Sequence, residues 1–199
     1  MEEKKHAGRW LFDLIESIGT AVVLAVLLLS FLTPTARVVG ESMRETLQDG
    51  DVLLLVRPWI AGEIEYGDIV VVREESFSSE PIIKRVIATG GETVEIDFET
   101  GLVTVDGRIL AEPYIRDLTT LAEGTEFPYT VPEGSLFLMG DNRNNSSDSR
   151  SSSLGAVSEE KLIGRAVFLI FPGVNAEDNQ RDIHRIGVIH RLSEENNAD

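Results

Sequence analysis

The stretch PIIKRVIATGGETVEIDF, residues 81–98, sets the interpretation of the whole chain. Its first half, PIIKRVIA at 81–88, is a short run of branched apolar residues typical of a β-strand. Gly90 and Gly91 then mark a turn, and TVEIDF at 93–98 alternates apolar and polar residues with the period of two expected of a half-buried strand. The stretch therefore predicts two β-strands separated by a glycine turn.

Further strands are predicted on both sides of this stretch. Short runs rich in Val, Ile, Leu and Phe occupy residues 51–56, 68–73, 135–139 and 166–171. The segment VTVDGRIL at 103–110 has the Asp-Gly pair of a type I′ hairpin turn at its centre. Because no segment after residue 33 shows convincing helical periodicity, we expect a mainly β domain at 34–174, followed by a polar C-terminal tail at 175–199.

The N-terminal segment differs in composition from the rest of the chain. Residues 10–33, WLFDLIESIGTAVVLAVLLLSFLT, are apolar over a length that crosses a bilayer as one helix, and Trp10 suits the interface. Lys4, Lys5 and Arg9 precede this segment, so the positive-inside rule places residues 1–9 in the cytoplasm. We predict a single uncleaved transmembrane anchor at 10–33 in the cell membrane, with the domain at 34–174 outside the cytoplasm.

Two other interpretations of the N-terminal segment fit less well. A cleaved signal peptide requires a small-residue cleavage site, and the nearest candidate, TPTA at 33–36, contains a proline. A buried core helix would be apolar on every side, which a domain of this size rarely accommodates.

Composition excludes several classes of function. The chain has 199 residues with 18 Lys and Arg against 34 Asp and Glu, and its net charge of −16 opposes binding to nucleic acid and charge-driven adhesion to anionic lipid. It contains no cysteine, which excludes disulfides, thiolate metal sites and cysteine nucleophiles. A hydrolase built on this chain would also have few histidines to use, since there are three, His6, His184 and His190.

Lys84 is the first candidate catalytic residue. Within the 81–88 strand it shares a face with Ile82 and Val86, because side chains two residues apart in a strand point the same way. Burial beside apolar side chains lowers the pKa of a lysine and makes the neutral amine available as a general base. A lysine on an edge strand that prevents aggregation explains the same pattern, and from the strand alone this simpler interpretation is preferred.

Ser42 is the second candidate and lies in GESMRETLQDGD, residues 40–51. A serine beside glycine is usually a turn or cap residue. Its position is more informative, because the chain between Thr33 and Ser42 spans only ~30 Å even when extended. A nucleophile at this position would act at the bilayer surface.

The third candidate is the polar segment MGDNRNNSSDSR, residues 139–150. Such a composition is common in exposed turns, but this segment follows directly on an apolar strand that fixes its start. Arg150 could pair with Asp148 or Asp141 to hold the loop against the sheet, and Ser146 or Ser147 could orient a neutral lysine. Functional residues concentrate on loops held by a rigid scaffold.

Together these segments resemble one family, the bacterial type I signal peptidases. The matching motifs are Ser42-Met43 with Thr46-Leu47, GDIVVV at 67–72, KRVIATGGETVEI at 84–96 and MGDNRNNSSDSR at 139–150. The resemblance extends from the anchor to about Phe171. It implies a membrane-bound serine endopeptidase that removes signal peptides from secreted preproteins, with a β-rich catalytic domain and neither metal nor cofactor.

The resemblance also implies roles for individual residues. Ser42 corresponds to the nucleophile and Lys84 to the general base of a Ser/Lys dyad, and Ser146 corresponds to the hydroxyl that orients the lysine amine. The residues that correspond to those bracing the site are Asp141, Asp148 and Arg150. In the implied reaction, Lys84 takes the proton of Ser42, Ser42 attacks the scissile carbonyl, and Lys84 activates the water that releases the acyl-enzyme. The Ser42 N–H would help to stabilise the oxyanion.

The substrates that the resemblance implies are secretory preproteins with small residues at positions −1 and −3 of the cleavage site. A membrane anchor suits such substrates, because an enzyme and a hydrophobic signal segment in one bilayer have a raised effective concentration. The implied partners are therefore preproteins and membrane lipid, the latter through the N-terminal helix.

Two positions depart from the family pattern. Glu45 stands where many members have Pro, which removes a φ restraint and adds a charge near the nucleophile. Gly40 stands where some members have a hydroxyl residue that donates to the oxyanion, and loss of such a donor costs ~10²–10³ in rate.

The departures keep open a second hypothesis, a catalytically weak membrane-anchored binding module, although the presence of both Ser42 and Lys84 opposes it. A self-cleaving Ser/Lys protein related to the β-rich repressor proteases is a third hypothesis, opposed by the anchor and the lack of a DNA-binding domain.

Overall fold

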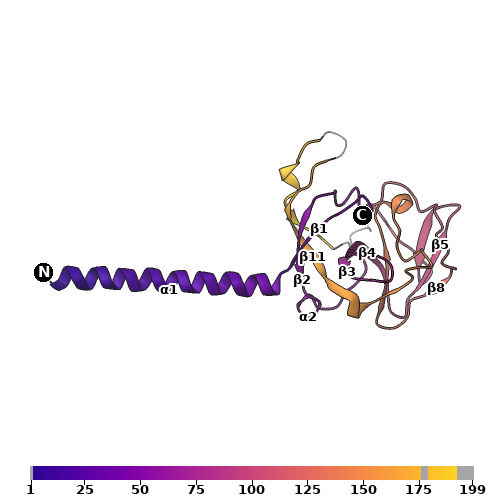
Figure 1. The fold of residues 1–199 in the computed structure, drawn as a ribbon. Helices are drawn as coiled ribbons and strands as arrows, with labels where there is room; N and C mark the ends of the chain where they lie inside the picture. The colour runs from indigo at the N-terminus through magenta and orange to yellow at the C-terminus, as the bar shows by residue number, and fades with distance from the viewer. Residues whose placement is uncertain (1, 176–178, 192–199) are drawn as a thin grey trace. The chain divides into compact units, whose positions relative to one another are not determined.

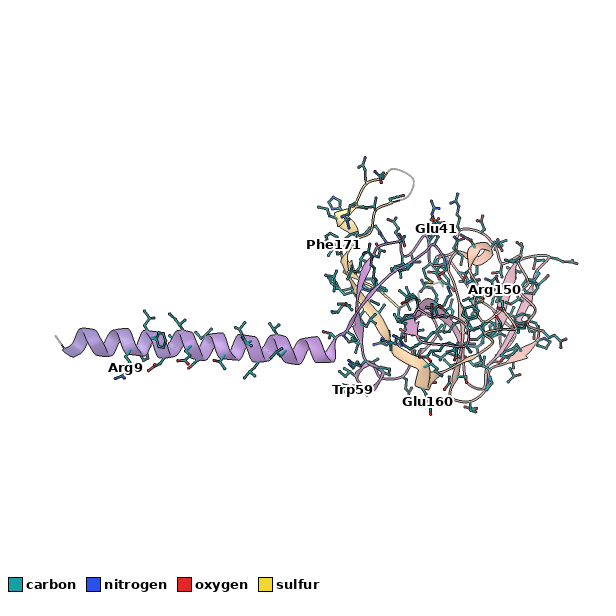
Figure 2. The ribbon with its side chains drawn as sticks, in the orientation of Figure 1. Arg9, Glu41, Trp59, Arg150, Glu160 and Phe171 are labelled. Atoms are coloured by element: carbon teal, nitrogen blue, oxygen red, sulfur yellow. The ribbon has the colours of Figure 1, made fainter. Side chains whose placement is uncertain are left out.

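A computed structural model describes residues 2–175 and 179–191. The contacts divide the chain into two units, Met1–Pro34 and Thr35–Asp199, which are described separately. The first unit is one helix, α1 (Glu2–Leu32). Its range Arg9–Leu27 is long and apolar enough to cross a membrane, with a mean hydropathy of 1.9, and the side chains of this range project outward on all sides (Figure 2). The helix agrees in place and composition with the predicted anchor, although a signal sequence near an N-terminus would have the same properties.

The second unit is built from two antiparallel sheets. The larger sheet has the order β1-β2-β11-β3-β4-β9-β10, and β12 also pairs with β11. Its strands are β1 (Thr35–Arg37), β2 (Val52–Val56), β3 (Ile69–Val72), β4 (Ile82–Thr89), β9 (Ser135–Met139), β10 (Val157–Ser158), β11 (Leu162–Phe171) and β12 (Gly187–Val188). The smaller sheet has the order β7-β6-β5-β8, with β5 (Thr93–Asp97), β6 (Leu102–Val105), β7 (Arg108–Ile109) and β8 (Tyr129–Thr130). Figure 1 shows β5 and β8 at one side of this unit and β1, β2 and β11 at the other.

Short helical segments connect some of these strands. One α-helical turn, α2 (Pro58–Ala61), follows β2. The 3-10 segments cover Arg143–Asn145, Glu159–Lys161 and Ile183–Arg185. The predicted fold class, mainly β with one N-terminal apolar helix, is therefore confirmed.

The long strands lie where the apolar runs predicted them. The hairpin between β6 and β7 turns at Asp106 and Gly107, whose φ angles of 49° and 76° are both positive, as a type I′ turn requires. The strand predicted at 166–171 begins earlier, at Leu162. Four strands were not predicted, namely β1, β8, β10 and β12, because two or three residues are too short to show a periodicity.

Strand β4 is the centre of the domain. It lies between β3 and β9 and contributes to three separate apolar clusters, through Ile83 in the first, Ile87 in the second and Val86 in the third. Burial of a branched side chain contributes about 1.5–3 kcal/mol, so this strand is strongly held along its length. Any side chain that β4 carries is therefore placed on a rigid element.

The predicted polar tail at 175–199 is partly folded. Residues 176–178 and 192–199 lie outside the described residues, but β12 pairs with β11 in the register Phe168↔Val188 and Leu169↔Gly187. This pairing is available because β3 covers only the Leu162–Arg165 part of that edge of β11. The described part of the tail is thus hydrogen-bonded to the larger sheet.

Candidate active site

Ser42 lies at the start of a short turn, which we call the nucleophile turn, residues 42–47. The Leu47 N–H donates to the Met43 carbonyl at 2.8 Å, and the side chains of Met43 and Leu47 are both 1% exposed in the core. Side chains four residues apart on one turn point in the same direction, so both can enter the same apolar cluster. The turn is therefore anchored in the core by Met43 and Leu47, and Ser42 lies half-buried at its start.

Lys84 reaches Ser42 from an interior strand. Because β4 lies between β3 and β9, the interpretation of Lys84 as an edge-strand residue is wrong. Lys84 is 4% exposed, and its Nζ donates to Ser42 Oγ at 2.6 Å. The fold thus places an amine and a hydroxyl that are 42 positions apart in the sequence at the distance required for direct proton transfer.

Burial lowers the pKa of Lys84 to about 8, because the ammonium form loses its hydration inside the domain. The carboxylate of Asp148 opposes this shift, the guanidinium of Arg150 adds to it, and the carboxylates of Asp141 and Glu123 oppose it more weakly. A free lysine has a pKa near 10.4, so the neutral amine is far more abundant here at pH 8 than on an exposed lysine.

The segment from Gly140 to Arg150, which we call the acidic–basic loop, is locked by Asp148 and Arg150. Arg150 donates from Nε to Asp148 Oδ1 and from Nη2 to Asp148 Oδ2, both at 2.8 Å. Its Nη2 also donates to the carbonyls of Arg143 and Ser146, so the guanidinium closes the loop on itself. Both charged side chains are completely buried, and Figure 2 shows Arg150 within the packed part of the domain. A paired, hydrogen-bonded charge is the form in which such groups persist in a protein interior.

Ser146 lies close to the backbone of Ser42. The Ser146 hydroxyl donates to Asp148 Oδ2 at 2.8 Å. Gly140 separates the two serines, and a Cβ at this position would clash with Ser146 Oγ and would lie 2.5 Å from the Ser42 carbonyl oxygen. Residue 140 must therefore be glycine for the loop to approach the nucleophile turn this closely. The hydrogen bond of Lys84 goes to Ser42, and the orienting role of Ser146 stays a prediction.

Asp141 pairs with Arg85 rather than with Arg150. Arg85 donates from Nε and Nη2 to the two oxygens of Asp141, at 2.8 and 2.7 Å. The Thr46 hydroxyl donates to Asp141 Oδ2 at 2.5 Å, and the Asn142 N–H donates to the Ser42 carbonyl at 3.0 Å. The loop and the nucleophile turn are therefore joined by side-chain and backbone hydrogen bonds.

Sequence reasoning singled out neither Arg85 nor the three residues that form a network beside it. These three are Glu112, Tyr114 and Arg143. Arg143 donates to both oxygens of Glu112, and the Tyr114 hydroxyl donates to the same carboxylate at 2.9 Å. The Arg85 guanidinium lies over the Tyr114 ring, 4.0 Å from its centroid.

A signal for Arg85 was present in the sequence. An arginine inside an apolar strand needs a buried partner, and a carboxylate in the polar loop was the obvious candidate. Nothing in the segment EPY at 112–114 marked Glu112 or Tyr114 as neighbours of the site, since their contacts join segments about 30 residues apart.

Both departures from the family pattern have positive φ, 90° at Glu45 and 88° at Gly40. Proline cannot adopt this conformation because its ring holds φ near −65°, so a proline at residue 45 requires a different turn. At residue 40 an added side chain would meet open space but would strain the backbone, whereas glycine adopts this conformation freely. The missing hydroxyl at residue 40 is thus linked to a backbone shape that favours glycine.

Comparison with known proteins identifies the family. Residues 11–171 match the family described as signal peptidase, peptidase S26. Signal peptidase I of Bacillus amyloliquefaciens is 39% identical over 165 residues, covering 79% of this chain and 83% of that protein. Signal peptidase I T of Bacillus subtilis (strain 168) is 38% identical with the same coverage, and signal peptidase I of Bacillus licheniformis is 36% identical over 182 residues, covering 86% and 96%. The resemblance read from the motifs is confirmed, and the chain belongs to the signal peptidase family, peptidase S26.

Proposed function

We propose that this protein is a membrane-bound serine endopeptidase that removes N-terminal signal peptides from secreted preproteins with a Ser42/Lys84 dyad. The observation that carries the proposal is the 2.6 Å contact between Lys84 Nζ and Ser42 Oγ in a chain of this family. A buried amine with a pKa of about 8 supports it, because the neutral form can take the hydroxyl proton.

The reaction proceeds by acyl transfer. Neutral Lys84 accepts the Ser42 proton as Oγ attacks the scissile carbonyl carbon, and the Ser42 N–H donates to the oxyanion. The resulting ammonium of Lys84 gives its proton to the leaving amine, and an ester between Ser42 and the signal peptide remains. Lys84 then takes a proton from water as the resulting hydroxide attacks the ester carbonyl carbon. The bond from that carbon to Ser42 Oγ breaks, the signal peptide leaves with a free carboxyl group, and Lys84 returns the proton to Oγ.

The surrounding charges hold the dyad in place. Asp148 and Arg150 keep the acidic–basic loop closed, and Asp141 ties it to the nucleophile turn through Thr46. We assign Ser146 the orientation of the Lys84 amine. This role requires its oxygen to accept from Nζ while its hydrogen is donated to Asp148, as the hydroxyl already does.

The proposed topology follows from the N-terminal helix. Residues 10–33 are the single membrane span, residues 1–9 are cytoplasmic and the domain at 34–174 is extracytoplasmic. The substrates are preproteins with small residues at −1 and −3, whose signal segments lie in the same bilayer. Protease added outside intact cells is expected to degrade the domain, and its protection would reverse the orientation.

Cleavage of a preprotein by the purified full chain in detergent tests the dyad. We expect Ser42→Ala and Lys84→Ala each to lower kcat by at least about 10³-fold, since each removes one member of a unit that acts together. Lys161→Ala is the matched control, because Lys161 is an exposed lysine far from the dyad in sequence. Wild-type activity no higher than that of the two dyad variants would overturn the proposal and favour a binding module.

The pH dependence of the same reaction tests the role of Lys84. Because the neutral amine is the active form, kcat should rise with pH through a midpoint near 8 and fall about tenfold per pH unit well below it. The Glu123 carboxylate stabilises the ammonium form of Lys84, so Glu123→Gln should move this limb to lower pH. A profile that is flat between about pH 6 and 9 would contradict the assignment of Lys84 as general base.

A further inference from the structure

The C-terminal segment binds the domain through two arginines. Arg185 donates to both oxygens of Asp51, at 3.0 and 2.7 Å, and Arg191 donates to both oxygens of Asp68, each at 2.8 Å. Asp51 is fully buried and Asp68 is 3% exposed. Each aspartate stands immediately before a strand, Asp51 before β2 and Asp68 before β3. The two arginine–aspartate pairs are thus alike in geometry, although Asp68 also accepts from Arg165 at 3.4 Å, and the two aspartates contact different parts of the chain.

Asp51 joins the nucleophile turn to the C-terminal part of the chain. Its Oδ2 accepts the N–H of Gln48 at 2.8 Å, and Gln48 directly follows the nucleophile turn. Its Oδ1 accepts the N–H of Gly173 at 2.6 Å, just beyond the end of β11. While Asp51 accepts these two backbone hydrogen bonds, the Arg185 guanidinium balances its negative charge.

Arg185 also contacts the nucleophile turn directly. Its Nη2 donates to the Thr46 carbonyl at 3.3 Å. The Thr46 hydroxyl contacts Asp141, and the Thr46 N–H donates to the Met43 carbonyl at 3.1 Å. Thr46 is therefore hydrogen-bonded to Asp141, to Arg185 and to Met43, the residue next to Ser42.

We propose that Arg185 is a positioning residue for Ser42, so that the C-terminal segment completes the active site. Arg185 does not touch Ser42, and it acts through Asp51 and the Thr46 carbonyl to fix the far end of the nucleophile turn. The inference rests on the proposed function, because it assumes that Ser42 is the nucleophile. It gives a catalytic reason for a segment that its composition marks only as a polar tail.

Arg191 provides the matched control. Among the described residues it binds Asp68, Glu65 and the Glu63 carbonyl, which lie in the turn before β3 and not in the nucleophile turn. Arg185 lines an open groove of about 330 Å³ beside Thr46, Leu47 and Tyr114. Water can enter the space that a shortened side chain leaves there, so we expect Arg185→Ala to fold.

The experiment compares cleavage kinetics of the full chain in detergent for the wild type, Arg185→Ala, Arg185→Lys, Arg191→Ala and Ser42→Ala. Arg185→Ala should lower kcat about tenfold, because a displaced nucleophile loses its attack geometry. KM, and affinity for a peptide with a reduced, non-cleavable scissile bond, should not change. Arg191→Ala should keep the wild-type kcat although it also loses a two-point arginine–aspartate pair. Arg185→Lys should give an intermediate kcat, since an ammonium cannot span Asp51 and Thr46 as the guanidinium fork does.

Several results would overturn this inference. A wild-type kcat in Arg185→Ala, or an equal loss in Arg191→Ala, would show that the segment supports only the fold. A fall in affinity for the non-cleavable peptide at unchanged kcat would place Arg185 in substrate binding instead. If Arg185→Ala does not fold, Arg185→Lys decides, and a folded lysine variant with wild-type kcat refutes the positioning role. An active Ser42→Ala variant or an inactive wild type would instead refute the proposed function, which is a distinguishable outcome.

Discussion

The acidic–basic loop and the nucleophile turn, which are joined at Ser42 and Thr46, are held in different ways. The end of the acidic–basic loop carries its own partners, because Asp148 and Arg150 are two residues apart and both are completely buried. The nucleophile turn is held by distant partners, since Thr46 bonds Asp141 across 95 positions and Arg185 across 139 positions. The Asp148–Arg150 end of the loop is thus specified locally, whereas the position of the nucleophile and of Asp141 depends on distant parts of the domain. Variants of the Asp148–Arg150 pair should first affect stability, and variants of the distant partners that hold Thr46 should first affect catalysis.

The largest effect is expected from Arg150→Met. This change leaves the Asp148 carboxylate buried without its partner and should lower the free energy of unfolding by about 3–5 kcal/mol. Urea denaturation followed by circular dichroism measures the loss. Adding Asp148→Asn to the same chain should restore part of the stability, because the unpaired charge is then gone. If Arg150→Met unfolds at the same urea concentration as the wild type, the loop is not locked by this pair.

A smaller effect is expected at Tyr114, which supports the turn from a distance. Tyr114→Leu removes the ring over which Arg85 lies, a contact of about 2 kcal/mol when desolvated. Because Arg85 holds Asp141 and Thr46, we expect kcat to fall clearly, while the free energy of unfolding falls by no more than this contact contributes. Tyr114→Phe keeps the ring and should retain most of the activity. Equal losses in both variants would assign the effect to the hydroxyl bond with Glu112 and not to the ring.

The smallest effect is expected at Glu45, which has φ of 90° on the exposed side of the turn. Its ion pair with Arg116 is exposed on both sides and contributes little. Glu45→Gly should exceed Glu45→Ala in stability by about 1 kcal/mol, because only glycine adopts this conformation without strain. Both variants should cleave at the wild-type rate. Equal urea midpoints for the two would show that residue 45 is not left-handed in solution.

Much of the fold was predictable because the strands that form its core are long enough to show a pattern. The run at 81–88 predicted β4, and alternation at 93–98 predicted β5. The same reasoning failed at β1 and β12, whose pairing is set by the free edges of β2 and β11 and not by their own composition. It also preferred an edge position for Lys84, since a single strand does not reveal how many neighbours it has.

The candidate site was predictable as a set of segments but not as a set of contacts. The motifs around Ser42, Lys84 and residues 139–150 identified which parts of the chain carry the chemistry. They did not show that Asp141 pairs with Arg85, or that Tyr114 and Arg185 support the site. Such pairings depend on which segments the sheets bring together, and that information is not local.

The sequence by itself determined the membrane-length apolar helix, the long strands, and the serine, lysine and loop that mark the family. These features are properties of short segments, in which periodicity, glycine turns and residue type act locally. The tertiary structure alone decided that Lys84 is buried, that its amine lies 2.6 Å from Ser42, and that its pKa is lowered to about 8. Burial and proximity arise only when segments distant in the chain pack together, because desolvation of an amine depends on every neighbour that displaces its water.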